Sequence, residues 1–226
     1  MSMQTALIIG ASRGIGFELA RQYRADGWRV IASVRKPQDG AQLESLGCEV
    51  VQLDVNDAAQ CAAFGKKLAT EKLAIGMINA GVYGPRTDGL EPPTDADFDA
   101  VMHANVLGAM RLLPLVGPAV ARANGRLSVT SSRMGSISLR TNAGGWLYRA
   151  SKAALNSLLA DTALTFGAQG AICVALHPGW VRTDMGGDGA DLAVADSAAG
   201  IRATLAGLTK ADNGKFFNYD GAPLSW

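Results

Sequence analysis

The sequence predicts one α/β domain built on a doubly wound sheet of about seven parallel strands, with helices on both faces. Short apolar, β-rich runs alternate with longer helical stretches along the chain, as in successive right-handed βαβ units. The predicted strands are continuous apolar runs, which is typical of parallel strands buried on both faces. The 226 residues are 48% hydrophobic, so the chain has enough apolar material for one large core.

The predicted elements follow one another without an internal repeat, low-complexity tract or linker, so we expect one domain over residues 1–226. The strands are expected at residues 6–9, 29–33, 49–53, 75–79, 126–131, 172–176 and 215–218. The helices are expected at residues 15–26, 58–70, 98–123, 150–166 and 197–208. Because Pro114 and Pro118 interrupt the longest helical stretch, we expect a bend or two helices there, with the break before Pro114 or near Gly108.

Composition and charge exclude several classes of protein. With 21 Lys and Arg against 20 Asp and Glu, the net charge is +1, whereas nucleic-acid and polybasic membrane-surface proteins carry a basic excess. The N-terminal residues lack the pattern of a secretory signal, and no run of 18 apolar residues occurs. Cys48, Cys61 and Cys173 have neither metal-ligand nor disulfide spacing. We therefore expect a cytoplasmic protein without a nucleic-acid partner, a membrane anchor or a bound metal.

A glycine-rich turn joins the first predicted strand to the first helix. Gly10 can adopt a positive φ, Gly14 allows the backbone to approach a pyrophosphate, and Gly16 lets the helix pack closely on the strand. The free N–H groups at the helix N-terminus favour an anion. This turn predicts a Rossmann-type dinucleotide site, and further cofactor contacts are expected from Ser12, Arg13 and Ile15.

Four motifs in order resemble those of the short-chain dehydrogenase/reductase family. They are the turn from Gly10 to Gly16, Asn79-Ala80-Gly81, Tyr148-Arg149-Ala150-Ser151-Lys152 and Pro178-Gly179. The sequences around Ser132, Tyr148 and Pro178, together with the last residue, Trp226, are similar to those of the C-factor-like and sniffer-like carbonyl reductases of that family. The resemblance covers essentially the whole chain.

Charge at the end of the second strand favours NADP(H) over NAD(H). No acidic residue stands there to hold a ribose 2′-hydroxyl, and Arg35 occupies the place where a 2′-phosphate would lie. Arg13 can reach the same phosphate from the glycine turn, because a guanidinium binds phosphate bidentately. By resemblance, Asp54 and Val55 flank the adenine. The family's motifs place further cofactor contacts at Asn79, Ala80, Gly81, Tyr148, Lys152, Pro178, Gly179, Val181 and Thr183.

The candidate catalytic pair is Tyr148 and Lys152, four residues apart and hence on one face of a helix. A nearby ammonium and an oxidised nicotinamide ring are expected to lower the phenol pKa from its reference value of about 10 and so prepare the phenol for proton transfer. By resemblance, Ser132 polarises the substrate carbonyl, and Asn105 relays water to the lysine through its side chain or its main-chain carbonyl. Ser131 and Thr130 are alternatives to Ser132, but strand alternation turns Ser131 to the opposite face.

The interval from Ser132 to Tyr148 is 16 residues, which is longer than the commonest spacing of the family. The additional residues are expected in the turn around 142–145. The glycine-rich stretch 184–195 is expected to be a mobile substrate loop beyond the strand ends. The predicted walls of the substrate site are Tyr83, Met134, Trp146, Leu147, Trp180 and Met185.

These residues predict an enzyme that reduces an aldehyde or ketone with NADPH. The alternative is a nucleotide-binding regulatory or signalling protein of the same fold with little turnover, although such a protein needs no proton donor. An epimerase or dehydratase of the extended branch of the family is disfavoured, because 226 residues leave no room for a separate substrate domain. The helix after Lys152 is apolar on more than one face, which predicts a homo-oligomer, dimer or tetramer.

Overall fold

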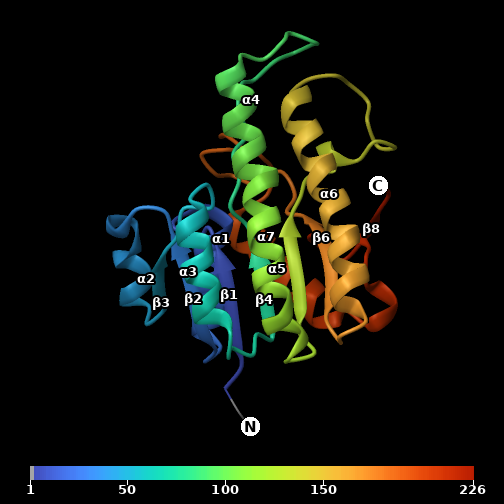
Figure 1. Cartoon of the computed structure of the whole chain (residues 1–226). Coiled ribbons are helices and arrows are strands. Elements are labelled where there is room, and N and C mark those ends of the chain that lie inside the picture. The colour runs from blue at the N-terminus through green and yellow to red at the C-terminus, as the bar shows by residue number, and fades with distance from the viewer. Residues whose placement is uncertain (1–2) are drawn as a thin grey trace.

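Seven parallel strands and one short antiparallel strand form the sheet in the computed structural model, which describes residues 3–226 (Figure 1). The strand order is β3-β2-β1-β4-β5-β6-β7-β8, so successive strands are added on one side of β1 up to β3 and on its other side from β4 onward. The predicted doubly wound sheet is confirmed, with β8 as an unpredicted antiparallel addition to β7. The strands are β1 (Thr5–Ile9), β2 (Arg29–Val34), β3 (Glu49–Gln52), β4 (Ile75–Ile78), β5 (Arg126–Thr130), β6 (Ile172–His177), β7 (Phe216–Asn218) and β8 (Pro223–Leu224).

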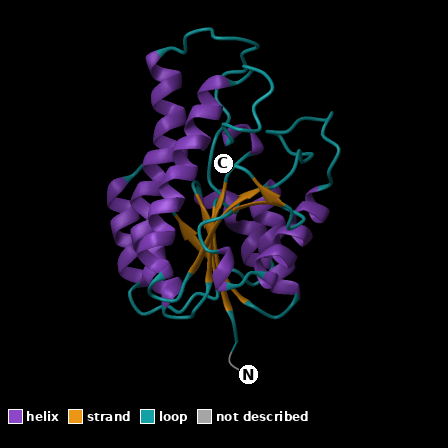
Figure 2. Cartoon of the chain, turned by 90° about the vertical axis from the view of Figure 1, so that its right-hand side faces the viewer, coloured by secondary structure: helices purple, strands orange, loops and turns teal. Residues whose placement is uncertain are grey.

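Helices cover both faces of the sheet, as the side view shows (Figure 2). The layer formed by α3, α5 and α6 packs on one face, and α1 and α7 lie together on the other. The helices are α1 (Gly14–Ala25), α2 (Ala41–Ser45), α3 (Ala58–Leu68), α4 (Asp95–Met102), α5 (Gly108–Ala121), α6 (Trp146–Gly167) and α7 (Val194–Gly207).

The alternation of side chains along β1 divides the core in two. Leu7 and Ile9 belong to the apolar cluster under α3, α5 and α6, while Ala6 and Ile8 belong to the cluster under α1 and α7. All four are fully buried. Successive side chains of a strand point to opposite faces, so a continuous apolar run supplies both cores at once. This buried central strand carries the glycine turn at its carboxyl end.

The long predicted helical stretch is one unbroken rod, drawn in green in Figure 1. A π-helix at His103–Leu107 joins α4 to α5, which confirms the irregularity near Gly108. The expected break before Pro114 is wrong, because Pro114 and Pro118 both lie inside α5. Pro114 is exposed, so water can satisfy the carbonyl that its missing N–H leaves free. The stretch Asp95–Ala121 is long and apolar enough to cross a membrane, but half of its most apolar window is buried in this fold, as in a core helix.

Two predicted boundaries near the site need correction. Helix α6 begins at Trp146 rather than at residue 150 and therefore contains Tyr148. The expected loop at 184–195 ends earlier, because α7 begins at Val194. Val181, which precedes the loop, forms an isolated parallel bridge with Leu192 inside it. Both corrections concern helix starts that lack a side-chain cap, the feature by which a helix start is most easily recognised.

Candidate active site

The glycine turn is held between strands at the carboxyl edge of the sheet. Gly10 has a φ of +86°, its N–H donates to Ser33 Oγ at 3.0 Å and its carbonyl accepts from Asn79 Nδ2 at 2.9 Å. A Cβ on Gly16 would lie 2.2 Å from the Gly10 carbonyl oxygen, so only glycine allows α1 to pack this closely. The predicted roles of Gly10 and Gly16 are therefore confirmed as conformational requirements of the turn.

The N-terminus of α1 has the features of an anion site. Its N-cap residue Arg13 makes no side-chain capping bond, and the first turn contains no acidic residue, so the first N–H groups remain available to a ligand. Arg13 extends to the surface and forms an ion pair with Asp184. Arg35 lies exposed directly after β2. Thr183 packs against Gly14, where an added Cβ would lie 3.3 Å from the threonine methyl group.

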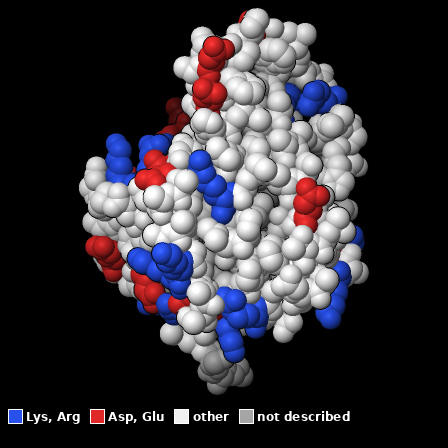
Figure 3. All heavy atoms as spheres, viewed as in Figure 1, with Lys and Arg blue, Asp and Glu red and all other residues white. Residues whose placement is uncertain are grey.

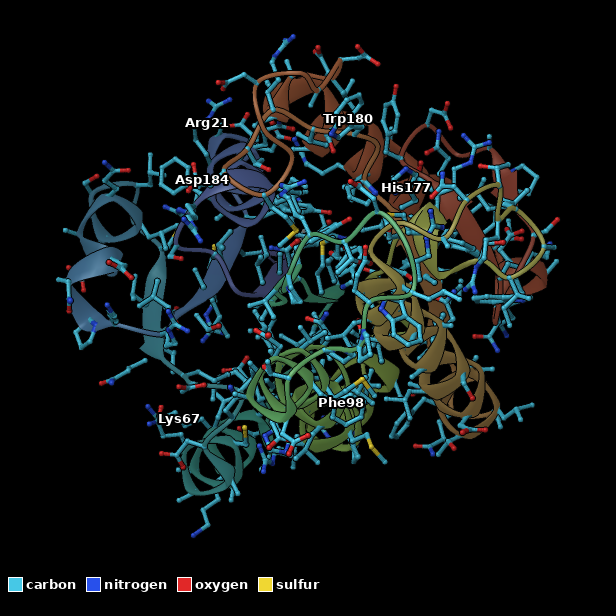
Figure 4. The ribbon with its side chains drawn as sticks, turned by 90° about the horizontal axis from the view of Figure 1, so that it is seen from above. Arg21, Lys67, Phe98, His177, Trp180 and Asp184 are labelled. Atoms are coloured by element: carbon cyan, nitrogen blue, oxygen red, sulfur yellow. The ribbon has the colours of Figure 1, made fainter. Side chains whose placement is uncertain are left out.

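The loop after β6 thus reaches over the glycine turn. Viewed from above the carboxyl ends of the strands, Trp180 and Asp184 lie along this loop, with Asp184 on the side of α1 (Figure 4). The loop leaves β6 through Pro178 and Gly179, whose φ is +86°. The structure therefore brings the predicted residues after β6 to the predicted phosphate turn.

Tyr148, Lys152 and Ser132 meet beside this turn. Ser132 follows β5, and its hydroxyl, which accepts from the Met134 N–H at 3.1 Å, lies close enough to the Tyr148 phenol to lower the pKa of that phenol. Lys152 Nζ lies 5.6 Å from the centre of the Tyr148 ring and donates to the Thr130 carbonyl at 2.8 Å. The alternative Ser131 faces away and donates its hydroxyl to Asn156. The choice of Ser132 over Ser131 thus agrees with the geometry.

Asn105 lies in the π-helix, and its side chain is fully engaged by the protein. Its Nδ2 donates to the Val82 carbonyl and to Ser151 Oγ, and its Oδ1 accepts from the Val82 N–H. Both N–H groups of this amide are therefore occupied, so a water relay at Asn105 must use an acceptor, either its main-chain carbonyl or the second lone pair of Oδ1. Ser151 in turn donates to the Tyr148 carbonyl at 2.8 Å. The amide thus ties the strand-end segment after Gly81 to the catalytic helix.

Burial dominates the electrostatics of the pair. It raises the pKa of Tyr148 to about 12, against a smaller lowering by the Ser132 hydrogen bond. Burial also lowers the pKa of Lys152 to about 8. In the protein alone burial outweighs the neighbouring ammonium, because both groups lose hydration together. The expected lowering of the phenol pKa, which also involves the oxidised nicotinamide ring, stays a prediction. The pair keeps a protonated phenol throughout the neutral range.

The predicted substrate walls divide into two groups. Tyr83 stacks on Tyr148 with ring centres 4.5 Å apart, and Met134 approaches Gly145 beside Tyr83. Arg86 lies 4.9 Å from the Tyr83 ring centre and donates to the Met185 carbonyl at 2.8 Å. Three of the predicted wall residues have other surroundings: Trp146 donates to the Glu91 carbonyl, Trp180 donates to the Gly186 carbonyl, and Leu147 is buried.

Several residues of the site were missed by the sequence reasoning. Ser33 holds the glycine turn, Ser151 and Asn156 fix the catalytic helix, and Arg86 joins Tyr83 to the substrate loop. Asn156 follows Lys152 by four residues, so helical spacing was a signal for it. No local pattern marks the others.

The family assignment follows from this arrangement. A glycine turn at the end of β1, with Tyr148 and Lys152 on one helix near Ser132, is typical of a nucleotide-binding α/β protein. The short chain dehydrogenase family matches residues 4–191. The chain therefore belongs to the short-chain dehydrogenase family.

Individual relatives agree with the predicted subgroup. The protein named C-signal from Myxococcus xanthus is 36% identical over 165 residues, which are 73% of this chain and 99% of that protein. The NADPH-bound carbonyl reductase from chicken fatty liver superposes with a TM-score of 0.88 at 29% identity over 100% of both chains. The carbonyl reductase Sniffer of D. melanogaster gives a TM-score of 0.88 at 27% identity, again over 100% of both chains.

Proposed function

We propose that this protein is an NADPH-dependent reductase that converts an aldehyde or ketone to an alcohol. The observation that carries the proposal is the meeting of Tyr148, Ser132 and Lys152 beside the phosphate turn. The structural neighbours named carbonyl reductases support the substrate class. The neighbour that binds NADPH supports the cofactor. The three cysteines are free and buried, in keeping with the cytoplasmic location that we propose.

The residues present fit a dinucleotide phosphate. The uncapped N-terminus of α1 and the backbone around Gly14 would hold the pyrophosphate. Arg13 and Arg35 would hold the 2′-phosphate, and Arg13 would then exchange its partner Asp184 for the stronger anion. Asp54 and Val55 would flank the adenine. Lys152 would bind the nicotinamide ribose, because its ammonium lies at the carboxyl end of β5, where it donates to the Thr130 carbonyl.

The chain's own groups account for carbonyl activation and proton transfer. The bound cofactor would supply the hydride. Ser132 would donate a hydrogen bond to the carbonyl oxygen and hold it against the phenol, where negative charge develops. Tyr148 would give its proton to that oxygen. The ammonium of Lys152 would stabilise the resulting phenolate, and buried water reaching the Asn105 carbonyl would return the proton.

Substitution of Tyr148 tests the proposal directly. Tyr148→Phe keeps the ring and its stacking on Tyr83, so NADPH should bind with unchanged affinity. Reduction should slow by about 10²- to 10⁴-fold, the range typical of a lost general acid. Ser132→Ala should also slow the chemical step, by about 3 kcal/mol of lost transition-state stabilisation. Lys152→Ala should both weaken NADPH binding and slow the chemical step. Cofactor fluorescence and single-turnover reduction measure the two steps separately.

A regulatory protein with little turnover is the second candidate. The name of one relative, C-signal, supports this candidate; that relative is 36% identical over 73% of this chain. The same experiment separates the candidates. If the native protein binds NADPH but reduces carbonyl compounds only at a background rate that Tyr148→Phe shares, the phenol is not the acid and the regulatory function becomes the better explanation.

A further inference from the structure

The turn between Ser132 and Tyr148 forms part of the active-site wall. Thr141, Asn142 and Ala143 in this turn are exposed to solvent. Gly145 ends the turn with a φ of +64° and is the N-cap of α6, so it offers no side chain to cap the helix. A surface turn of this kind needs anchors from elsewhere in the protein to hold one conformation.

Arg149 provides such an anchor from within α6. Although it carries a charge, its side chain is buried, with 7% of the residue exposed. Its Nε donates to the Gly144 carbonyl at 2.8 Å and its Nη2 donates to Asn142 Oδ1 at 2.7 Å. Asn142 Oδ1 also accepts from the Gly144 N–H at 3.2 Å. One guanidinium therefore binds two points of the turn at once, which its rigid planar geometry permits.

Gly145 transmits this restraint to the substrate side. An added Cβ on Gly145 would lie 2.5 Å from Tyr83 Oη and 3.1 Å from Met134 Cε, so these two side chains rest against its backbone. The Gly145 N–H donates to the Thr87 carbonyl at 2.8 Å, which joins the turn to the loop after β4. The position of Gly145 thus sets how far Tyr83 and Met134 can retreat from the space beside Tyr148.

An ion pair does not explain the burial of Arg149. Within residues 3–226, no carboxylate forms a salt bridge with its guanidinium. The two groups that accept hydrogen bonds from the guanidinium, the Gly144 carbonyl and Asn142 Oδ1, are both neutral. Burial and the neighbouring charge of Arg140 lower the pKa of Arg149. A buried cation without an acidic partner is costly, so the hydrogen bonds to the turn are the contacts that offset the free-energy cost of burying this guanidinium.

We propose that Arg149 is a positioning residue that sets the substrate wall of the active site. By holding Asn142 and Gly144 it fixes Gly145, and through Gly145 it places Tyr83 and Met134 against the substrate. This inference rests on the proposed carbonyl reductase function. Its consequence is that Arg149 governs the binding of carbonyl compounds large enough to reach the wall, whereas small aldehydes need only Ser132 and Tyr148.

Steady-state kinetics with propanal and benzaldehyde test the proposal. Arg149→Met should raise KM for benzaldehyde about tenfold, because a loosened wall must be reordered by the ligand. KM for propanal, kcat for propanal and the Kd for NADPH should stay within about twofold. Arg149→Lys should recover part of the loss, since one ammonium reaches one of the two acceptors. Arg140→Met is the matched control, because it removes the same charge from the same turn and should leave both substrates unaffected.

Hydrogen exchange on the full-length protein supplies a readout that does not depend on activity. The amides of residues 144–147 should exchange about tenfold faster in Arg149→Met than in the native protein, with the sheet unchanged. Asn142→Ala changes only an exposed side chain and should show a smaller effect in the same direction. An equal rise in KM for both aldehydes, or unchanged hydrogen exchange in the turn, would overturn the proposal. If the native protein reduced neither aldehyde, the reductase function would fail, while exchange would still decide whether Arg149 holds the turn.

Discussion

Tyr148 and Lys152 show how burial prepares single residues for chemistry. The phenol, with 7% of the residue exposed, and the ammonium, with 3%, share one desolvated pocket. Burial raises the pKa of Tyr148 to about 12 and lowers that of Lys152 to about 8. The two shifts separate pKa values that nearly coincide in water, where they are 10.0 for the phenol and 10.5 for the ammonium. The lysine, not the tyrosine, is therefore the group that changes charge nearest to neutral pH.

The pH dependence of reduction should follow the lysine. Tyr148 stays protonated through the neutral range, so it does not limit the rate there. Lys152 is charged below its pKa of about 8 and loses its charge above it, so reduction should be flat up to that pH and fall beyond it. Lys152→Arg should move the fall to higher pH, because a guanidinium stays charged. A rate profile from pH 6 to 10 checks this, with Lys67→Arg, on α3 away from the site, as control (Figure 4).

Cofactor choice should depend on Arg35. Arg35→Asp removes one charge-assisted contact with a 2′-phosphate, which is worth about 1.5–3 kcal/mol, so the Kd for NADPH should rise by about tenfold or more. The Kd for NADH should change little. The adjacent Lys36→Asp carries the same change of charge on an exposed residue and should have a smaller effect. Fluorescence titration of the native protein and the two variants measures the Kd for each cofactor, and equal native affinity for the two cofactors would contradict the assignment.

At the scale of elements, the glycine turn and the start of α1 depend on the absence of side chains. A Cβ on Gly16 would meet the Gly10 carbonyl at 2.2 Å and Asn79 Nδ2 at 2.7 Å. Neither neighbour can retreat, since Asn79 Nδ2 is itself bonded to that carbonyl at 2.9 Å. An alanine here must push α1 away from β1. The turn would then lose both its packing and its shape as an anion site.

Substitution of Gly16 should therefore affect stability and cofactor binding together. Gly16→Ala should lower the free energy of unfolding by about 1–3 kcal/mol, as for other overpacked positions, and weaken NADPH binding. Gly207→Ala is the matched control, because no atom lies within 4 Å of its Cβ position and alanine is the better helix former. It should leave stability unchanged or raise it by up to about 1 kcal/mol. Urea denaturation with and without NADPH measures both effects.

The sequence predicted the elements with strong periodicity and missed those without it. The seven parallel strands are apolar runs, whereas β8 has two residues and begins with Pro223, so no pattern marks it. Helix α2 has five residues, which is too short for an apolar face to show. The spacing of Tyr148 and Lys152 was readable because it is local. The bond from Asn105 to Ser151 joins residues 46 positions apart, and only the folded topology brings such residues together.

At the scale of the whole molecule, the face formed by α5 and α6 is poor in charge. Figure 3 shows few charged side chains over these two helices. Leu164 on α6 is 78% exposed and Met110 on α5 is 51% exposed. Large exposed apolar side chains gathered on one face are typical of protein–protein contacts. The predicted homo-oligomer therefore has a candidate surface on the side of the sheet that carries the catalytic helix.

Self-association through this face should be sensitive to one charge on α6. We expect the native protein to form a dimer or tetramer, and Leu164→Glu to shift it toward the monomer, because a buried unpaired carboxylate is costly in an interface. Leu90→Glu is the matched control, since Leu90 is 69% exposed but lies in the loop between β4 and α4. Light scattering at micromolar concentration measures the mass of all three proteins. A native protein that is already monomeric, or a Leu90→Glu variant that dissociates as readily as Leu164→Glu, would contradict an interface centred on α6.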